Sequence, residues 1–166
     1  HLRSGSGKDL KMYNEICNGI ADVLHGAYPD AAIYTEDIRQ GLEVPAFLIT
    51  SVSLSREKIV GMIRYDCTYA IQYFPDEKLN ERSELREMQD RLDVILRRIP
   101  VKFDENETEL VFRQQEPGEA TVLDGVLTYT LRLIGYFIDP EEYEKMEQLE
   151  SANFTITEEL SGSKKN

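Results

Sequence analysis

The stretch VLDGVLTYTLRLIGYF, residues 122–137, constrains the fold of this chain more than any other. Asp124-Gly125 lies between two β-prone runs, and a two-residue type I′ turn requires φ > 0 at both central positions, which Asp and Gly tolerate. On the strand that follows, one face carries Leu127, Tyr129, Leu131, Leu133 and Phe137. The pattern predicts a β-hairpin whose second strand buries one of its faces.

Other stretches also have the two-residue period of strands. Residues 62–74 alternate cleanly, with one face formed by Ile63, Tyr65, Cys67, Tyr69, Ile71 and Tyr73. Residues 46–54 predict a strand that alternates through Leu48, Thr50, Val52 and Leu54, and a short strand is expected at 32–35. Residues 109–123 predict a less regular strand that is interrupted near Pro117-Gly118.

Two helices are indicated by apolar residues that recur every three or four positions. The first spans residues 8–27 and is stopped by Pro29. The second spans residues 80–99, with Asn80 as N-cap and Pro100 as its end, and its apolar stripe comprises Leu85, Met88, Leu92, Ile95, Leu96 and Ile99. A short acidic helix is expected at 141–150 after Pro140.

The predicted order is therefore α-β-β-β-α-β-β-α, an α+β fold with a single mostly antiparallel sheet and two helices packed on one face. The chain of 166 residues has the length of one domain. We interpret residues 1–7, HLRSGSG, as the remnant of an expression tag and linker. The domain is expected at 8–150, followed by a flexible tail at 151–166.

The composition, with 41% hydrophobic and 30% charged residues, is typical of a soluble globular protein. No apolar run approaches the roughly 20 residues that cross a bilayer, and no secretory signal is recognised, so no membrane partner is expected. Cys17 and Cys67 fall in elements predicted to be buried, which favours free thiols and a reducing cytoplasm.

The formal net charge of −12 argues against a tight grip on nucleic acid, because phosphate binding requires clustered Lys and Arg. No sequence-specific binding to DNA or RNA is expected. An acidic protein is still suited to line a passage through which DNA moves, since like charges prevent sticking.

The sequence lacks an evident constellation of catalytic residues, which predicts that the chain is not an enzyme. Apart from His1, the only histidine is His25, near the end of the first helix, where a surface or capping role is favoured over catalysis. The carboxylates at Glu36-Asp37 and at 104–107 do not match a calcium loop, and a carboxylate-pair glycosidase is not singled out. No zinc spacing or phosphate-binding loop is present, so no metal and no cofactor are expected.

The residues between 12 and 150 resemble a known family. Residues 12–49 read MYNEICNGIADVLHGAYPDAAIYTEDIRQGLEVPAFLI, which contains the turn and strand at 28–36 and the Gly41-to-Pro45 loop before Phe47. The similarity continues at YAIQYFP (69–75), DGVLTYTLRL (124–133) and MEQLE (146–150). These motifs, in this order and spacing, resemble the small tail terminator proteins of long-tailed phages and prophages of Gram-positive bacteria.

The resemblance implies a structural virion protein. Proteins of this family form a ring, typically of six copies, on the head-proximal end of the tail tube, where they stop polymerisation and present a docking surface to the head-side connector. The implied partners are other copies of the chain, the tail tube protein and the connector. The implied locations are the host cytoplasm during assembly and then the virion tail.

Two polar loops, 36–43 and 53–61, are candidates for the ring or tube interface, with Glu36, Asp37, Arg39, Arg56 and Lys58 as candidate contact residues. Ordinary solvated loops are the alternative interpretation. For the whole chain, the alternatives are another neck or tail-completion protein that joins head and tail, and a small-ligand-binding domain.

Overall fold

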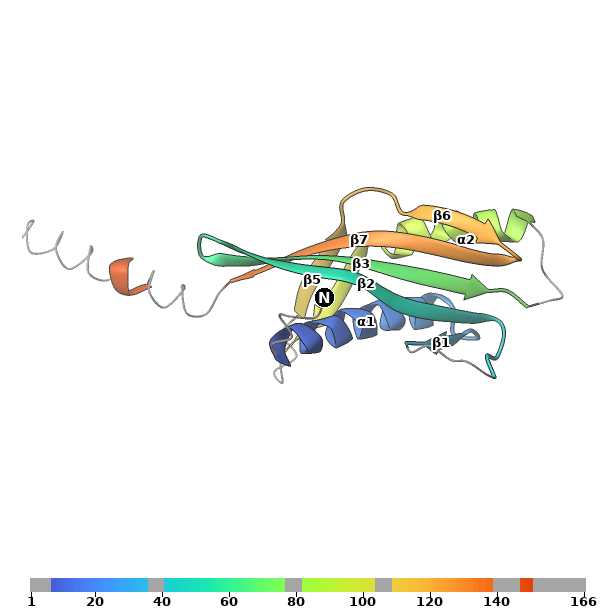
Figure 1. Cartoon of the computed structure of the whole chain (residues 1–166), viewed down its shortest axis with the longest axis horizontal. Coiled ribbons are helices and arrows are strands. Elements are labelled where there is room, and N and C mark those ends of the chain that lie inside the picture. The colour runs from blue at the N-terminus through green and yellow to red at the C-terminus, as the bar shows by residue number, and fades with distance from the viewer. Residues whose placement is uncertain (1–6, 36–40, 77–81, 104–108, 139–146, 151–166) are drawn as a thin grey trace, which may run out of the picture. The chain divides into compact units, whose positions relative to one another are not determined.

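The computed structural model describes residues 7–35, 41–76, 82–103, 109–138 and 147–150 (Figure 1). The elements, in chain order, are α1 (Gly7–Ala27), β1 (Ala32–Tyr34), β2 (Ala46–Ile59), β3 (Met62–Phe74), α2 (Arg82–Ile95), β4 (Arg98–Lys102), β5 (Glu109–Gln114), β6 (Glu119–Leu123) and β7 (Val126–Ile138). Residues 147–150 are also helical. The chain divides into a larger unit, residues 1–55 with 65–135, and a smaller unit, residues 56–64 with 136–166.

The strands form one sheet in the order β1-β2-β3-β7-β5-β4, and β6 pairs with β7 beside β5. The pairs β4–β5, β5–β7 and β6–β7 are antiparallel, whereas β1 runs parallel to β2. One edge of β7 is shared, because β5 pairs with Leu133 and Ile134 and β6 pairs with residues 126–130. The α+β class and the mostly antiparallel sheet are confirmed.

The Asp124-Gly125 hairpin forms as predicted. Asp124 has φ 51° and Gly125 has φ 75°, and the flanking residues Leu123 and Val126 are register partners. Two consecutive positive φ values define a type I′ turn, whose twist matches that of the strands it joins. The turn residues therefore specify this hairpin locally.

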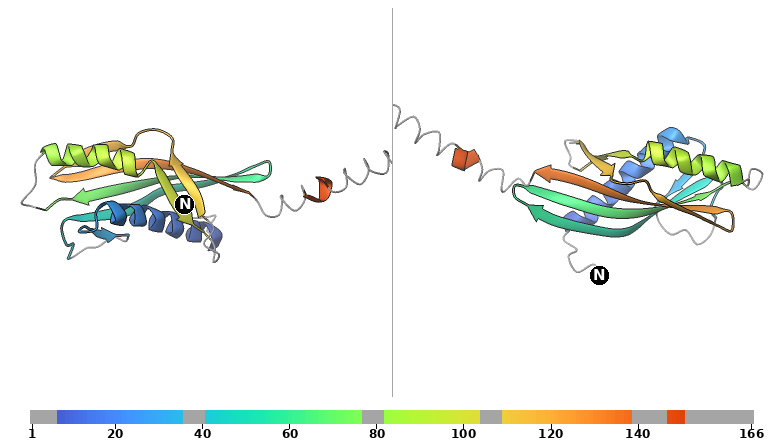
Figure 2. Two further views of the ribbon diagram at one scale, coloured as in Figure 1. Left: turned by 180° about the vertical axis from the view of Figure 1, so that it is seen from behind. Right: turned by 90° about the horizontal axis from the view of Figure 1, so that it is seen from above.

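Both helices cover the same face of the sheet in the larger unit (Figure 2). The hydroxyl of Tyr69 on β3 donates a hydrogen bond to the carbonyl of Tyr13 in α1, at 3.0 Å. The hydroxyl of Tyr73, on the same face of β3, donates to the Glu84 carboxylate in α2, at 3.5 Å. The alternating tyrosines of β3 thus pack beneath the helices, as the sequence pattern predicts.

The core of the larger unit combines one stripe from each helix with the inner residues of β3 and β7. The largest side chains in it are fully buried: Tyr69, Tyr129, Phe47, Phe112, Ile16, Ile20, Leu24, Ile49, Ile71, Leu92, Leu96 and Ile99. Helix α1 also contacts β4, and a Cβ added at Gly19 would lie 2.7 Å from the Pro100 carbonyl oxygen. Glycine is needed there because helix and strand approach so closely.

The second helix is shorter than predicted. Helix α2 ends at Ile95, and Pro100 lies within the strand β4 instead of terminating the helix. Ile99 is buried as expected, but from a strand, where Ile99 and Val101 face inward. β4 lies at the end of the sheet order, and proline is accommodated on an edge strand because it lacks a ladder donor. Asn80, the predicted N-cap, lies outside the described residues.

Two strand predictions need correction. The single strand predicted at 109–123 is two strands, β5 and β6, separated by residues 115–118, so the interruption near Pro117 is confirmed. On β2 the predicted face of Leu48, Thr50, Val52 and Leu54 is wrong, because Phe47 and Ile49 are buried whereas Val52 is 60% exposed. The Phe47 ring packs against Tyr28 and Tyr73, with ring centroids 5.3 and 4.9 Å apart, and these contacts place Phe47 on the inward face of β2.

Candidate assembly interface

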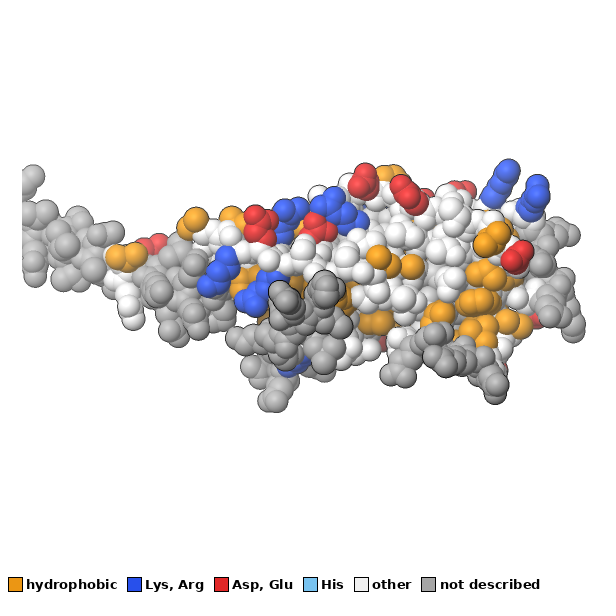
Figure 3. Space-filling view, viewed as in Figure 1, with side chains coloured by type: hydrophobic (Ala, Val, Ile, Leu, Met, Phe, Trp, Pro, Cys, Tyr) orange, Lys and Arg blue, Asp and Glu red, His pale blue; other side chains and the backbone are white. Residues whose placement is uncertain are grey.

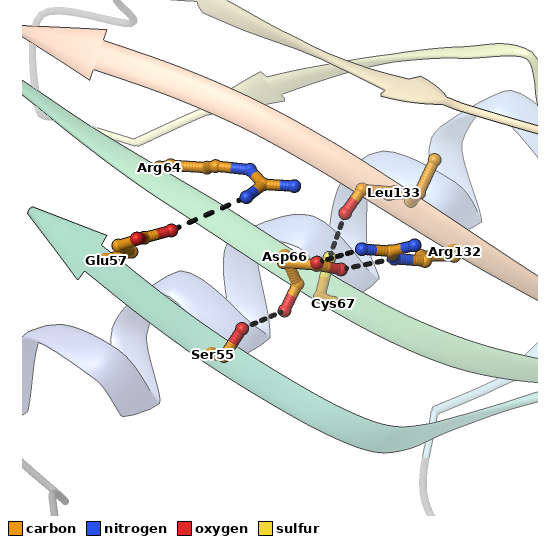
Figure 4. Close-up of polar contacts among 7 residues, drawn as sticks. All are labelled: Ser55, Glu57, Arg64, Asp66, Cys67, Arg132 and Leu133. Atoms are coloured by element: carbon orange, nitrogen blue, oxygen red, sulfur yellow. Dashed lines mark hydrogen bonds and ion pairs between the residues drawn. The ribbon is translucent and has the colours of Figure 1, made fainter. Parts of the chain in front are cut away.

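A bidentate ion pair joins β3 and β7 in the larger unit (Figure 4). The Arg132 guanidinium donates to the two Asp66 carboxylate oxygens, at 2.9 Å from Nε and 2.5 Å from Nη2. The Asp66 carboxylate raises the pKa of Arg132 through these hydrogen bonds and through its charge. Because Arg132 is exposed, this pair orients the two side chains more than it stabilises the fold.

On the same strand pair, Cys67 is a buried free thiol, and its Sγ donates to the Leu133 carbonyl oxygen at 3.4 Å. Burial, and next the Asp66 charge, raise the pKa of Cys67 to about 12. Cys17 is a half-buried free thiol, and burial raises its pKa as well. A thiol with a raised pKa is a poor nucleophile at neutral pH, so neither cysteine has the environment of a catalytic residue.

Arg56 and Lys58, two of the predicted contact residues, lie on β2 with exposed side chains. The segment 53–61 is therefore a strand that leads into a two-residue turn, and the prediction of a polar loop is wrong there. In the same smaller unit, the Arg64 guanidinium lies 3.5 Å from the Glu57 carboxylate (Figure 4). The other predicted contact residues, Glu36, Asp37 and Arg39, lie outside the described residues.

The β2–β3 turn carries large apolar side chains at exposed positions, which sequence analysis missed. Val60 is 92% exposed, and its neighbours Ile59 and Met62 are 42% and 38% exposed. Hairpin turns are normally built from Gly, Asn and Asp, so valine at the most exposed position has no role in forming the turn. We call residues 56–64 the basic hairpin, because they carry Arg56, Lys58 and Arg64 against the single carboxylate of Glu57.

A second exposed segment of the larger unit carries side chains of the opposite charge, and Arg97, which follows α2, lines the depression beside it. Residues 115–124, which we call the acidic edge, include the exposed carboxylates of Glu116, Glu119 and Asp124 and no Lys or Arg. Two apolar side chains of β6 lie between them, and Leu123 is 74% exposed. β6 pairs with β7 only, so its other edge has no strand partner among the described residues.

A polar cluster holds the acidic edge against α2. The hydroxyl of the fully buried Tyr129 side chain donates to the Asp93 carboxylate at 2.5 Å and accepts from the Gln114 amide at 2.8 Å. Asp93 also accepts from the backbone N–H of Gly118, at 3.2 Å. Burial, and next the hydrogen bond to Asp93, raise the pKa of Tyr129 to about 12. Asp93 is thus a structural acceptor that links α2 to β7 and to the residue before β6.

The described surface has shallow depressions. One, of about 510 Å³, lies between α1 and β4 and is lined by Glu15, Asn18, Gly19, Asp22, Val23, Pro100 and Lys102. Another, of about 300 Å³, lies beside the polar cluster and is lined by Asp93, Arg97, Gln114, Gln115, Glu116 and Pro117. Neither contains a His or Cys, and no group of three metal-ligating side chains occurs in the described part of the chain.

Charged side chains of both signs are interspersed on the face shown in Figure 3. None of the described helices combines the length and the apolar character that a membrane span requires. His25 lies in the last turn of α1 with an exposed side chain, as predicted. The arrangement offers charged and apolar contact surfaces.

Comparison with known proteins gives a family match for most of the chain. The family model described as phage tail terminator protein matches residues 15–146. One solved structure is similar to this chain with a TM-score of 0.49 and 12% identity, over 80% of this chain and 97% of that chain. No curated protein matches the chain.

The family match covers α1 from Glu15 onward, all of α2, the whole sheet and the two surfaces described above. It agrees with the resemblance that the motifs between Met12 and Glu150 indicate. Phage tail terminators are structural proteins of the phage tail, and this chain belongs to the phage tail terminator family.

Proposed function

We propose that this protein caps the head-proximal end of a phage tail tube as a ring of copies, typically six. The ring stops tube polymerisation and presents a docking surface to the head-side connector. The family match over residues 15–146 is the observation that carries this proposal. The chain assembles in the host cytoplasm, in a phage, a prophage or a tail-like bacteriocin, and remains in the virion tail.

The physical requirement for such a ring is a fixed angle between two different contact surfaces. Heterologous contacts generate a closed ring only if each copy rotates the next by a constant amount. A single hydrogen-bonded sheet whose inner face is packed against two helices supplies stiffness, because close-packed interiors resist deformation. The described elements therefore suit a building block of an assembly.

The charge of the chain supports a position around a DNA passage. A net charge of −12 repels the phosphate backbone, so DNA moving through a ring of such chains would not adhere to it. The ion pairs Asp66–Arg132 and Arg64–Glu57 neutralise arginine side chains that could otherwise contact phosphate.

Electron microscopy of tube protein polymerised with and without this chain tests the proposal. Tubes of limited length with added density at one end are the expected result. Unlimited growth in both samples would refute it. Binding to isolated head vertices without an effect on tubes would instead assign the chain to the head-joining proteins.

A ligand role is tested separately by thermal unfolding in the presence of metabolites. We expect no shift in melting temperature, because the described depressions contain no His or Cys and no group of three metal-ligating side chains. A reproducible shift of several degrees with one compound class would favour a small-ligand-binding domain.

A further inference from the structure

Two exposed segments of this chain carry opposite charges, and both also expose apolar side chains. The basic hairpin, residues 56–64, carries three cationic side chains and one carboxylate. The acidic edge, residues 115–124, carries three carboxylates and no cation. Opposite potentials on two surfaces steer them together and select them over like-charged alternatives.

Each surface also exposes large apolar side chains that its own fold does not use. On the basic hairpin these are Ile59, Val60 and Met62, and on the acidic edge they are Val122 and Leu123. Interfaces typically combine an apolar centre with a charged rim, and both surfaces have this composition. We place Val60 and Leu123 at the centres of the two contact surfaces, because their side chains are 92% and 74% exposed.

The backbone of the acidic edge adds a further capacity for binding. β6 pairs with β7 on one side, and its other edge carries N–H and C=O groups without a strand partner among the described residues. Unpaired strand edges are templates for association with another chain. The position of this edge is fixed, because Asp93 holds the Gly118 backbone and the Tyr129 side chain.

From these observations we infer that the basic hairpin of one copy docks on the acidic edge of the next copy. The contact is heterologous, so repetition of it produces a ring or a filament and not an isolated dimer. Arg56 and Lys58 face Glu116 and Glu119 across the contact, and Val60 packs beside Leu123. This inference rests on the proposed ring and assigns its two contact surfaces.

A charge-swap experiment on tube ends tests the contact. The double variant R56E/K58E should require about tenfold or more protein to limit tube length, because like charges then meet at the interface. Adding E116K/E119K in the same chain should restore capping at the original concentration. The control R98E/K102E makes the same change in net charge on exposed residues of β4 and should cap normally.

Cross-linking gives an independent readout. Two single variants, Val60→Cys and Leu123→Cys, are mixed in a Cys17→Ser background and added to tubes under mild oxidation; Cys67 is retained because it is buried. A disulfide-linked pair that contains both variants is expected. Neither variant alone should form pairs, since the other surface then lacks a cysteine. Melting curves confirm that each variant is folded.

The outcomes separate this inference from the proposed function. The inference is overturned if R56E/K58E caps tubes normally. It is also overturned if adding E116K/E119K does not restore capping and the Val60→Cys and Leu123→Cys variants form no cross-link. The proposed function survives either outcome, because the unaltered chain still caps tubes. If R56E/K58E abolishes capping without rescue or cross-link, the basic hairpin is instead assigned to a contact with the tube protein. Failure of the unaltered chain to cap refutes the proposed function, and the inference with it.

Discussion

The two hairpins of the sheet use different residues at their turns. The β6–β7 turn has Asp124 and Gly125, both at positive φ, which is the combination that a two-residue hairpin favours. In the β2–β3 turn only Gly61 has positive φ, 74°, and the preceding residue is the exposed Val60. The residues of the β6–β7 turn have the backbone preferences that the turn requires. The β2–β3 turn instead exposes the Val60 side chain, which is not buried in the core.

The strands next to these two turns also differ in how much of their surface is buried. β7 leaves the Asp124-Gly125 turn and buries Leu127, Tyr129 and Leu131 within six residues. β2 enters its turn through residues 55–59, and all of these are exposed. An exposed, partly apolar hairpin that contributes little to its own core is a common feature of surfaces that bind a partner. Substitutions that affect stability should therefore concentrate near β7, and substitutions that affect assembly should concentrate near Val60.

The largest effect on stability is expected for Tyr129→Ala. The change removes a fully buried aromatic side chain and leaves Asp93 and Gln114 without its hydroxyl. We expect a loss of about 3–5 kcal/mol in the free energy of unfolding. Chemical denaturation of the unaltered protein and of the Tyr129→Ala variant measures this difference in the free energy of unfolding. A loss below about 1 kcal/mol would show that the β6–β7 hairpin is not anchored through this residue.

A smaller effect is expected for Gly125→Ala, which places a Cβ at φ 75°. The strain of a left-handed residue should lower the free energy of unfolding by about 1–2 kcal/mol. Gly61→Ala is the matched variant, because φ is 74° there. Its effect on global unfolding should be smaller, since an exposed turn can open locally without unfolding the core. Equal losses would remove the distinction between the two hairpins.

High pH should destabilise the core around β3 and β7. The pKa values of Tyr73 and Tyr129 are raised from 10.0 to about 12 by burial and nearby carboxylates. Between these values the unfolded chain binds fewer protons than the native chain, so stability falls as pH rises from 10 to 12. We expect about 1 kcal/mol per group after solvent screening. Unfolding curves across this range measure the slope, which Tyr129→Phe should reduce. If Tyr129→Phe leaves the slope of stability against pH unchanged, the loss of stability at high pH does not arise from ionisation of Tyr129.

The smallest effect on stability is expected for Val60→Ser. Because the side chain is 92% exposed, its replacement should change the free energy of unfolding by less than about 0.5 kcal/mol. Leu127→Ala on β7, which is buried, should cost about 2–4 kcal/mol in the same assay. A large loss for Val60→Ser would mean that the basic hairpin belongs to the core of the monomer.

Much of the core was predictable because it follows local periods. The buried face of β3 and the inward residues of β7 were read from alternation, and the stripe of α2 from its helical spacing. β4 was missed because Arg98–Lys102 is short and contains Pro100, which reads as a helix stop until an adjacent strand is known. The buried face of β2 was predicted wrongly because it depends on contacts between distant segments, such as those of the Phe47 ring with Tyr28 and Tyr73.

The candidate interface was only partly predictable. Arg56 and Lys58 stand out in an acidic sequence and are exposed on β2. The acidic edge was not recognised, because its exposure depends on how β5 and β6 share one side of β7. Asp93 has the four-residue spacing to Arg97 that suits a helical ion pair, and nothing in that spacing indicates its contact with Tyr129, which spans 36 positions in the chain.

By itself, the sequence determined the type I′ hairpin at Asp124-Gly125, the inward faces of β3 and β7, and the resemblance to tail terminators. These features depend on neighbours two to four positions apart, and such neighbours are visible in any linear reading. Only the tertiary structure decided which face of β2 is buried, which strands lie at the edges, and which exposed surfaces carry opposite charge. Those properties arise from pairings between distant segments, and the balance of burial and hydrogen bonding across the whole sheet selects them.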